Sequence, residues 1–377
     1  AERGEDEAVF DGDRRLTFRQ WWERSGSMAA AITERLPSRE GVVALHLRRS
    51  IEWLLCMRAC MRSGHRYLAL DAAAPAGYNA RLLPAAGASL VIVDDASVAY
   101  DVATVTCDAL GQREALPPTP FAPSSDDTAY LIFTSGSTGE SKPVAIPWRQ
   151  VSRCVASFVR QQPPGRDAVI AQRTTAIFAP AAKEWLIALA CGIPLVIVPA
   201  EASVDMAALA SLVERHAITH LHVVPSQLRS LLANATRDRA PWASLRCLVV
   251  AGEVLSPDLA DTCHEVLPAV RLLDNYGCSE LNDIYYADVQ GTGTAVDNTR
   301  IYLLDEALAH VPAGVPGAIY VSGDSLGEGY PGHPGMTAAA WLPDPFSGIP
   351  SDRMFRTGDM GRLRDDGRLE LLGRRDD

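Results

Sequence analysis

The segment Thr134–Pro143 gathers five hydroxyl side chains, two glycines and one lysine within ten residues. Gly136 and Gly139 allow backbone N–H groups to turn toward an anion, while Lys142 supplies a positive charge. The spacing Gly136-x-x-Gly139-x-x-Lys142 excludes a Walker A loop, which has four residues between its first glycine and Gly-Lys. A flexible linker is the alternative. The β-rich run Ala129–Phe133 before the segment favours a phosphate-binding loop instead.

Three later segments also carry side chains suited to binding a nucleotide. Asn275–Glu280 contains Tyr276, whose ring can stack on a base, and Glu280, whose carboxylate can hold Mg²⁺. Phe355–Asp359 places Asp359 after Thr-Gly, where a carboxylate on a tight turn suits ribose hydroxyls. Gly373–Asp376 lies at the end of the chain. A turn residue is the plain alternative for Asp359, and a helix cap is the alternative for Glu280.

Alternating strand and helix patterns are predicted to position these segments. Short apolar runs between amphipathic runs indicate a mostly parallel α/β sheet with helices on both sides. The predicted strands are 41–47, 89–93, 193–198, 220–224, 247–250 and 270–273. The predicted helices are 18–32 (with Thr17 as N-cap), 51–62 (ending at Gly64), 206–215 and 257–266.

The pattern changes after about Tyr286, where short strands alternate with many Gly, Pro and Asp residues. The predicted strands there are 301–304, 318–321 and 369–372. The sequence therefore predicts two mostly parallel α/β-sheet subdomains in 1–286 and a smaller, distorted β-barrel subdomain in 287–375.

Composition limits the function classes. The chain has 377 residues, 47% hydrophobic residues and a net charge of -11, without a basic cluster, so nucleic acid is not expected as a partner. No apolar run reaches the ~18 residues of a membrane helix, and the N-terminus has no signal-peptide core. The eight cysteines form no CxxC pair and are predicted to be reduced core residues of a cytoplasmic protein. Histidine spacing predicts no zinc site.

Taken together, these motifs resemble the adenylate-forming superfamily, and most closely the adenylation domains of nonribosomal peptide synthetases. The resemblance covers nearly the whole chain. The matching segments, in order, are 16–18, 63–71, 134–143, 275–280, 317–330, 355–359 and 373–376. Cys278 stands where the family usually has proline. Several motifs in a fixed order are far more specific than any one of them.

The resemblance implies a reaction and its partners. A small carboxylic acid attacks the α-phosphorus of ATP, giving an acyl-adenylate and pyrophosphate with the help of Mg²⁺. The acyl group then passes to the phosphopantetheine thiol of a carrier protein. A small MbtH-like activator protein is a further partner that the family suggests. Bringing two anions together makes charge neutralisation and alignment the main catalytic tasks.

The family motifs assign roles residue by residue. Thr138, Lys142 and Glu280 are the expected catalytic residues, and Glu280 is the expected Mg²⁺ ligand. The residues expected at ATP are Thr134, Ser135, Gly136, Ser137, Thr138, Gly139, Lys142, Gly252, Asp274, Tyr276, Ser279, Asp359 and Arg374. The residues expected around the acid are Ala179, Pro180, Lys183, His222, Val249, Ala251, Asn275, Asp283 and Ile284.

Two departures from the family pattern matter. The family continues into a C-terminal subdomain of about a hundred residues that carries a further catalytic lysine. We therefore expect residues 1–375 to be the N-terminal core and 376–377 the start of the hinge, with weak adenylation but retained ligand binding. Secondly, Ala179 occupies the position where amino-acid-activating relatives have an aspartate that pairs with the α-ammonium. An unpaired ammonium in a partly dry pocket costs several kcal/mol, so a plain α-amino acid is disfavoured.

Two classes of carboxylic acid remain as expected substrates. One lacks an α-amine, as aryl, keto or hydroxy acids do, with Lys183 or His222 meeting a polar substituent or second carboxylate. The other carries its amine elsewhere, and Asp283 receives it. Lys183 itself has two interpretations: its family register points it into the pocket, whereas its pattern alone favours a surface lysine or one paired with Glu184 or Asp283.

The main alternative function within the superfamily is an acyl- or aryl-CoA ligase. An alternative from another class is a non-catalytic nucleotide-binding module. The presence of Thr138, Glu280, Asp359 and Arg374 together argues against the second.

Overall fold

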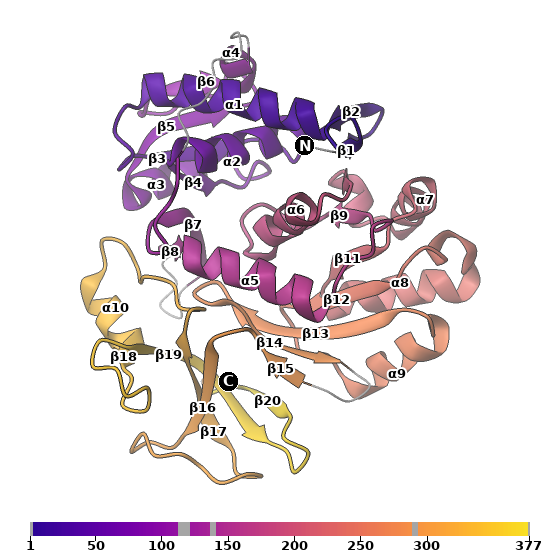
Figure 1. The fold of residues 1–377 in the computed structure, drawn as a ribbon, viewed down its shortest axis with the longest axis vertical. Helices are drawn as coiled ribbons and strands as arrows, with labels where there is room; N and C mark the ends of the chain where they lie inside the picture. Colours follow the sequence, from indigo (N-terminus) through magenta and orange to yellow (C-terminus); the bar gives the residue numbers. More distant parts are fainter. Residues whose placement is uncertain (1–2, 112–120, 136–140, 289–292, 376–377) are drawn as a thin grey trace.

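Runs of β-branched and aliphatic residues form the strands of two mostly parallel sheets, and a third sheet lies toward the C-terminus (Figure 1). The computed structural model describes residues 3–111, 121–135, 141–288 and 293–375. Of the sequence-predicted site residues, Gly136, Ser137, Thr138 and Gly139 lie outside these ranges.

The first sheet has six strands in the order β6-β5-β3-β4-β7-β8. Every neighbouring pair is parallel except the hairpin β7–β8. Its strands are β3 (Val42–His46), β4 (Arg66–Ala69), β5 (Ala88–Val93), β6 (Thr104–Thr106), β7 (Thr128–Ser135) and β8 (Ser141–Pro147). The helices that accompany it are α1 (Phe18–Arg35), α2 (Ile51–Ser63), α3 (Ala76–Ala86) and α4 (Cys107–Gly111).

The second sheet has nine strands in the order β15-β14-β13-β12-β11-β9-β10-β1-β2. The central strands β13 to β1 are parallel, and the strands at both edges are antiparallel. Its strands are β1 (Glu7–Asp11), β2 (Arg14–Thr17), β9 (Ile170–Gln172), β10 (Leu195–Ile197), β11 (His220–Val223), β12 (Cys247–Ala251), β13 (Arg271–Cys278), β14 (Asn282–Asp288) and β15 (Gly293–Ala295). Its helices are α5 (Trp148–Gln161), α6 (Pro180–Cys191), α7 (Met206–His216), α8 (Pro225–Arg237) and α9 (Pro257–Val266).

The third sheet is antiparallel, with the order β16-β17-β19-β18 and β20 on the long strand β19. Its elements are β16 (Thr299–Leu304), β17 (Gly317–Gly323), α10 (Pro334–Ala340), β18 (Trp341–Pro343), β19 (Arg353–Leu363) and β20 (Leu369–Arg374). The subdomain boundary predicted after Tyr286 falls inside β14, because β14 and β15 continue the second sheet. Because β15 belongs to the second sheet and β16 to the third, the boundary between these two sheets lies between β15 and β16.

Local signals in the sequence explain the helix ends. Thr17 caps α1 through a reciprocal pair: its hydroxyl accepts from Gln20 N at 3.1 Å, and its own N–H donates to the Gln20 side chain at 2.9 Å. Helix α2 ends at Gly64, whose φ of 78° is the left-handed conformation that glycine adopts without strain. Both predicted helix limits are confirmed at these two residues.

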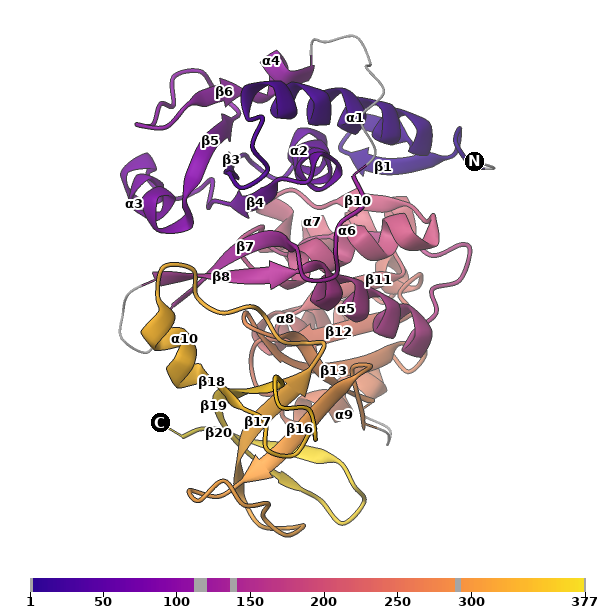
Figure 2. The same cartoon turned by 60° about the vertical axis from the view of Figure 1, so that its left-hand side comes forward.

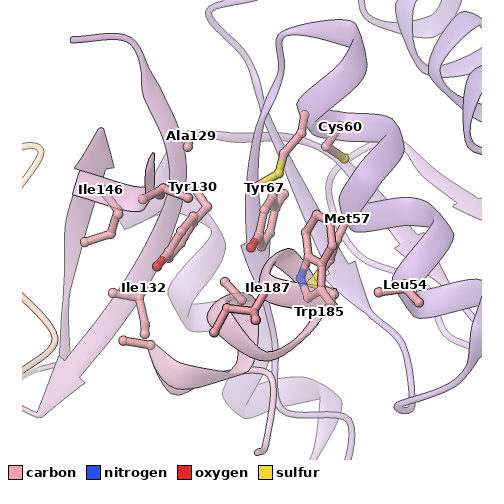
Figure 3. Close-up of a cluster of buried hydrophobic side chains, with 14 of the residues drawn as sticks. Leu54, Met57, Cys60, Tyr67, Ala129, Tyr130, Ile132, Ile146, Trp185 and Ile187 are labelled. Atoms are coloured by element: carbon pink, nitrogen blue, oxygen red, sulfur yellow. The ribbon is translucent and has the colours of Figure 1, made fainter. Parts of the chain in front are cut away.

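The first two sheets are joined by a continuous apolar core. Figure 3 shows Met57 of α2 and Trp185 of α6 in one cluster with Tyr67 of β4 and Tyr130 of β7. The rings of Tyr67 and Tyr130 are stacked with centroids 5.2 Å apart. In Figure 2 strands β3, β5 and β6 of the first sheet lie above α6, and strands β11, β12 and β13 of the second sheet lie below it. This shared core fixes hairpin β7–β8 relative to the strands that carry the remaining site residues.

All eight cysteines lie in the described ranges with free thiols, and six of them are buried, as predicted. None of the helices in those ranges combines the length and apolar character of a membrane span.

Candidate functional site

Hairpin β7–β8 carries the two ends of the predicted phosphate loop. Thr134 of β7 is the register partner of Lys142 on β8, so these two residues lie side by side on antiparallel strands. The Lys142 ammonium lies 4.1 Å from the centroid of the Tyr330 ring. This cation–π contact holds Lys142 beside Tyr330, which also contacts Glu280.

Glu280 is buried and lies at the other end of the same tyrosine. The Tyr330 hydroxyl donates a hydrogen bond of 2.8 Å to Glu280 Oε1. The backbone carbonyl of Glu280 accepts from the Gln150 side chain at 3.0 Å, and that side chain also donates to the Ser325 carbonyl at 2.6 Å. Lys142, Tyr330 and Glu280 thus form one chain of contacts. Tyr330 was not identified from the sequence as a site residue.

A hairpin between β13 and β14 presents the Asn275–Glu280 motif. The sequence placed this motif after a strand at 270–273, but β13 continues through Cys278 because its ladder with β14 runs that far. Gly277 makes the close turn possible: a Cβ there would lie 1.9 Å from the Asn282 carbonyl oxygen. Only glycine fits this approach, and the register shifts between Tyr276 and Gly277.

Tyr276 and Asp359 meet although 83 residues separate them in the chain. The Tyr276 hydroxyl donates a hydrogen bond of 2.7 Å to Asp359 Oδ2. Burial and the neighbouring carboxylate raise the pKa of Tyr276, so its proton stays in this bond. Arg374 Nη1 lies 4.0 Å from Asp359 Oδ1, because β20 pairs with β19 at these two residues. The third sheet therefore brings two predicted ribose-binding residues to the predicted base-stacking tyrosine.

The other residues predicted at the nucleotide lie on the same strands or beside them. Gly252 follows β12 with a φ of 88°. Asp274 is on β13, where burial raises its pKa to about 6. Ser279 lies between β13 and β14.

The predicted acid pocket contains a buried ion pair. Lys183 Nζ lies 2.7 Å from Asp283 Oδ2, and both side chains are 5% exposed or less. Lys183 Nζ also contacts the Tyr286 hydroxyl at 3.2 Å, and that hydroxyl donates to Asp283. Asn275 Nδ2 donates to Asp283 Oδ1 at 2.7 Å. Burial alone would raise the pKa of Asp283, but the charge of Lys183 and the hydrogen bonds from Lys183, Tyr286 and Asn275 lower it.

Lys183 is therefore paired with Asp283, which is one of the arrangements that its sequence pattern favoured. The pair is buried and does not lie on the surface. The ammonium and the carboxylate neutralise each other. Tyr286, which completes the cluster, was not identified from the sequence.

His222 lies beside this cluster on β11. Its ring centroid is 6.4 Å from that of Phe158, which in turn meets Tyr286 edge-on. Burial, with the charge of Lys183, lowers the pKa of His222 well below its ordinary value, so the ring is neutral. Among the described residues, neither ring nitrogen of His222 has a hydrogen-bond partner, and neither does Asn275 Oδ1.

Glu184, the neighbour of Lys183 on α6, is fully buried and heavily hydrogen-bonded. It accepts from the Gln172 side chain, from the backbone N–H groups of Arg173 and Thr174, and from the Thr174 hydroxyl. Burial nevertheless raises the pKa of Glu184 to about 7. Its Oε1 lies 3.5 Å from Nδ1 of His222.

The remaining pocket positions are small or apolar. Ala179 is the N-cap of α6 and Pro180 its first residue, and the helix has no side-chain cap. Val249, Ala251 and Ile284 are aliphatic, and Ile284 is fully buried. His222 on β11 is the register partner of Val249 on β12, which in turn pairs with Leu273 on β13. Ala251 on β12 pairs with Asn275 on β13. Because alternate residues of a strand point to the same side, His222, Val249, Ala251 and Asn275 lie on one face of the sheet.

Comparisons with known proteins agree with this architecture. The AMP-binding enzyme family matches residues 1–331. Chondramide synthase cmdD of Chondromyces crocatus is 34% identical over 98% of this chain, which spans 10% of that protein. The chain spans between 5% and 32% of the length of eight curated relatives that it matches.

Solved structures match over almost the whole chain. The AMPPNP-bound form of the nonribosomal peptide synthetase FmoA3 superposes with a TM-score of 0.91 at 27% identity, over 100% of this chain and 42% of that one. The N-terminal subdomain of Klebsiella oxytoca NpsA has a TM-score of 0.88 at 24% identity, over 97% of this chain and 95% of that one. This chain belongs to the AMP-binding enzyme family, the adenylate-forming superfamily that includes the adenylation domains of nonribosomal peptide synthetases.

Proposed function

We propose that this chain activates a small carboxylic acid as an acyl-adenylate for loading onto a carrier protein in nonribosomal peptide biosynthesis. The observation that carries the proposal is the adjacency of Tyr276 and Asn275 on β13. Tyr276 contacts Asp359, and Asn275 contacts the buried Lys183–Asp283 pair. In the proposed site, successive residues of one strand serve the nucleotide and the acid, so the acid would lie next to the nucleotide.

In the proposed reaction a carboxylate oxygen attacks the α-phosphorus of ATP. The bond from that phosphorus to the oxygen bridging it to the β-phosphorus breaks, and pyrophosphate leaves with the electron pair. Tyr276 stacks on the base and Asp359 binds the ribose hydroxyls after exchanging its bond with the Tyr276 hydroxyl. Lys142 neutralises the β- and γ-phosphates. The solved structure of FmoA3 in its AMPPNP-bound form supports ATP as the nucleotide.

Glu280 suits Mg²⁺ by its chemistry. Mg²⁺ is commonly bound through one or two carboxylates together with substrate phosphates. One oxygen of Glu280 accepts from Tyr330, and the adjacent Lys142 marks the phosphate side. When bound, Mg²⁺ would neutralise charge on the departing pyrophosphate. Tyr330 orients the carboxylate, and Gln150 holds its backbone.

The proposed acid is not a plain α-amino acid. Ala179 offers no counter-ion for an α-ammonium. The structure also bears on the two acid classes that the sequence left open. An amine directed at Asp283, or a second carboxylate directed at Lys183, must compete with an existing buried ion pair. An acid with an uncharged polar group avoids that competition and is favoured.

The proposed acyl acceptor is the phosphopantetheine thiol of a carrier protein, because relatives of this chain include the probable nonribosomal peptide synthetase CymA of Salinispora arenicola and the nonribosomal peptide synthetase FmoA3. An MbtH-like activator stays a prediction. Thiolation with carrier protein and with free coenzyme A separates this acceptor from that of a CoA ligase. Preference for coenzyme A would contradict the carrier-protein assignment.

Pyrophosphate exchange by the full-length protein tests the activity itself. We expect ATP-dependent exchange with aryl, keto or hydroxy acids and little with proteinogenic α-amino acids. Calorimetry with ATP and this chain tests the nucleotide site separately. Absence of ATP binding would support the non-catalytic alternative, and exchange only with α-amino acids would overturn the substrate class.

A further inference from the structure

Helices α1 and α2 enclose an arginine that has no anionic partner among the described residues. Arg58 of α2 is 7% exposed. Within the described ranges the structure records neither a hydrogen bond nor an ion pair for its guanidinium. That group carries five N–H donors and a charge, and arginine is almost never fully buried without a partner. The missing acceptor therefore needs an explanation.

The recorded neighbours of the Arg58 guanidinium are aromatic or positively charged. Its central carbon lies 5.1 Å from the ring centroid of Trp21 and 5.1 Å from that of Trp22. The Arg62 guanidinium, one turn further along α2, lies 3.9 Å from the centroid of the same Trp22 ring. Burial, with the charge of Arg62, lowers the pKa of Arg58 to about 10, so the group stays charged at neutral pH. Two cations thus share one tryptophan ring.

Arginines on the neighbouring surface do have carboxylate partners. Four exposed arginines of β2 and α1 lie between 2.6 and 3.8 Å from a carboxylate oxygen: Arg14, Arg15, Arg19 and Arg24. An exposed ion pair contributes little because water already solvates both charges, whereas a buried charge without a counter-ion is costly. Within the described residues, the counter-ion is missing at the position where it would matter most.

The cluster is open to solvent on one side. Trp22 is 56% exposed. Arg62 Nη1 donates to Ser25 Oγ at 3.0 Å and to the Trp22 carbonyl, which holds this second guanidinium against α1. The nitrogens of Arg58 are not among the fully enclosed unpaired atoms, so solvent reaches them. Figures 1 and 2 show α1 and α2 side by side in the part of the molecule opposite the third sheet.

We propose that Arg58 and Arg62 form a binding site for an oxyanion, a carboxylate or a phosphate group, beside the ring of Trp22. A planar guanidinium binds such a group through parallel N–H···O bonds, so Arg58 gains the acceptors that the described chain does not supply. The bound negative charge also offsets the repulsion between the two arginines. The site uses no residue of the proposed acyl-adenylation site, so the proposal is independent of that function.

Thermal unfolding of this chain with two probes tests the site and its ligand class. The probes are inorganic phosphate and N-acetyl-glutamate amide, each exchanged for sodium chloride at constant ionic strength. At least one probe should raise the unfolding midpoint by about 2 °C, because a ligand that binds only the folded state stabilises it. A rise with the glutamate probe alone identifies a protein carboxylate as the ligand, and a rise with phosphate alone identifies a phosphate group. No rise with either probe would overturn the proposal.

Arg58→Met is the decisive variant, because it keeps a long apolar side chain and removes the guanidinium. The probe-dependent rise should be lost, apart from the general stabilisation that phosphate gives any protein. Arg81→Met is the matched control. Arg81 also lies over an aromatic ring, 5.6 Å from the Tyr78 centroid, but at an exposed position, so this variant should keep the full rise. Equal rises in the unmodified chain and in Arg58→Met would refute the site.

Tryptophan fluorescence gives a second readout that does not depend on the folding of Arg58→Met. Binding of the anion at Arg62 should change the emission of Trp22 saturably with probe concentration. Trp22→Phe keeps an aromatic ring for both arginines, so it should lose the emission change and retain the thermal shift. Arg62→Met should weaken probe binding by about tenfold, since a hydrogen bond to a charged group is lost. Unchanged affinity in Arg62→Met, or no saturable change with either probe, would contradict the proposal.

Discussion

Lys183 of α6 and Asp283 of β14 form a buried ion pair, with Nζ 2.7 Å from Oδ2. The pair joins a helix to a strand one hundred residues away and neutralises both charges inside the acid pocket. Tyr286 and Asn275 satisfy the remaining polar atoms of the carboxylate. The pair thus makes the pocket polar without adding net charge. Variants that remove only one of the two charges should therefore differ from variants that remove both.

Removing one partner of this pair should be far more harmful than removing both. Lys183→Met leaves Asp283 buried without its counter-ion and should lower the free energy of unfolding by about 3–5 kcal/mol. The double variant Lys183→Met/Asp283→Leu should recover part of that loss. Urea unfolding provides the measurement, with Arg246→Met at the exposed Arg246–Asp167 pair as the control. A double variant less stable than the single one would contradict this account.

Asp359 should contribute to nucleotide affinity through the ribose. Asp359→Ala is expected to weaken ATP binding by roughly tenfold or more, because hydrogen bonds to a charged group contribute about 1.5–3 kcal/mol. Tyr276→Phe keeps the stacking ring and removes only the hydroxyl bond to Asp359, so it should bind ATP nearly normally. Calorimetry with ATP decides, and Asp366→Ala, at an exposed carboxylate of the same subdomain, is the control. Unchanged affinity in Asp359→Ala would remove its assigned role.

Tyr330 should matter for the triphosphate but not for AMP. Tyr330→Leu removes both the ring against Lys142 and the hydroxyl at Glu280. We expect MgATP affinity to fall by about tenfold, since a cation–π contact and a charge-assisted hydrogen bond are lost together. AMP affinity should stay the same. Equal losses for the two nucleotides would indicate a general structural defect instead.

Stability should depend on pH through Glu184. Burial raises its folded-state pKa from the ordinary 4.5 to about 7, so the folded protein holds this proton more tightly than the unfolded chain. The resulting contribution is fully present below pH 4.5 and is lost as the pH rises to about 7. Its size is roughly 3 kcal/mol. Glu184→Gln should flatten the unfolding free energy between pH 5 and 7, and an unchanged slope would assign the effect to other groups.

Ala179→Asp should shift substrate preference toward α-amino acids. The new carboxylate stands at the start of α6, where the helix dipole favours negative charge, and it offers a counter-ion for an α-ammonium. Pyrophosphate exchange by the full-length protein across amino and non-amino acids measures the shift. Ala179→Asn is the control, because it has similar shape without charge. A substrate profile identical to that of the parent would count against the assignment of this position.

The sequence by itself determined the elements and the family. Thr17 and Gly64 mark the ends of helices because capping depends on a few neighbouring residues. The apolar runs at 220–224 and 247–250 indicated buried parallel strands, and the order of motifs indicated the adenylate-forming superfamily. Each of these signals is local or repeats along the chain, so no spatial information is needed to detect it.

Only the tertiary structure decided the partners of the polar side chains. Lys183 pairs with Asp283 rather than with the adjacent Glu184, Tyr330 joins Lys142 to Glu280, and β13 extends through Cys278 because β14 pairs with it. These contacts join residues far apart in the chain. Their formation depends on how sheets and helices pack and on which buried charges must be neutralised, and no local pattern of residues encodes that outcome.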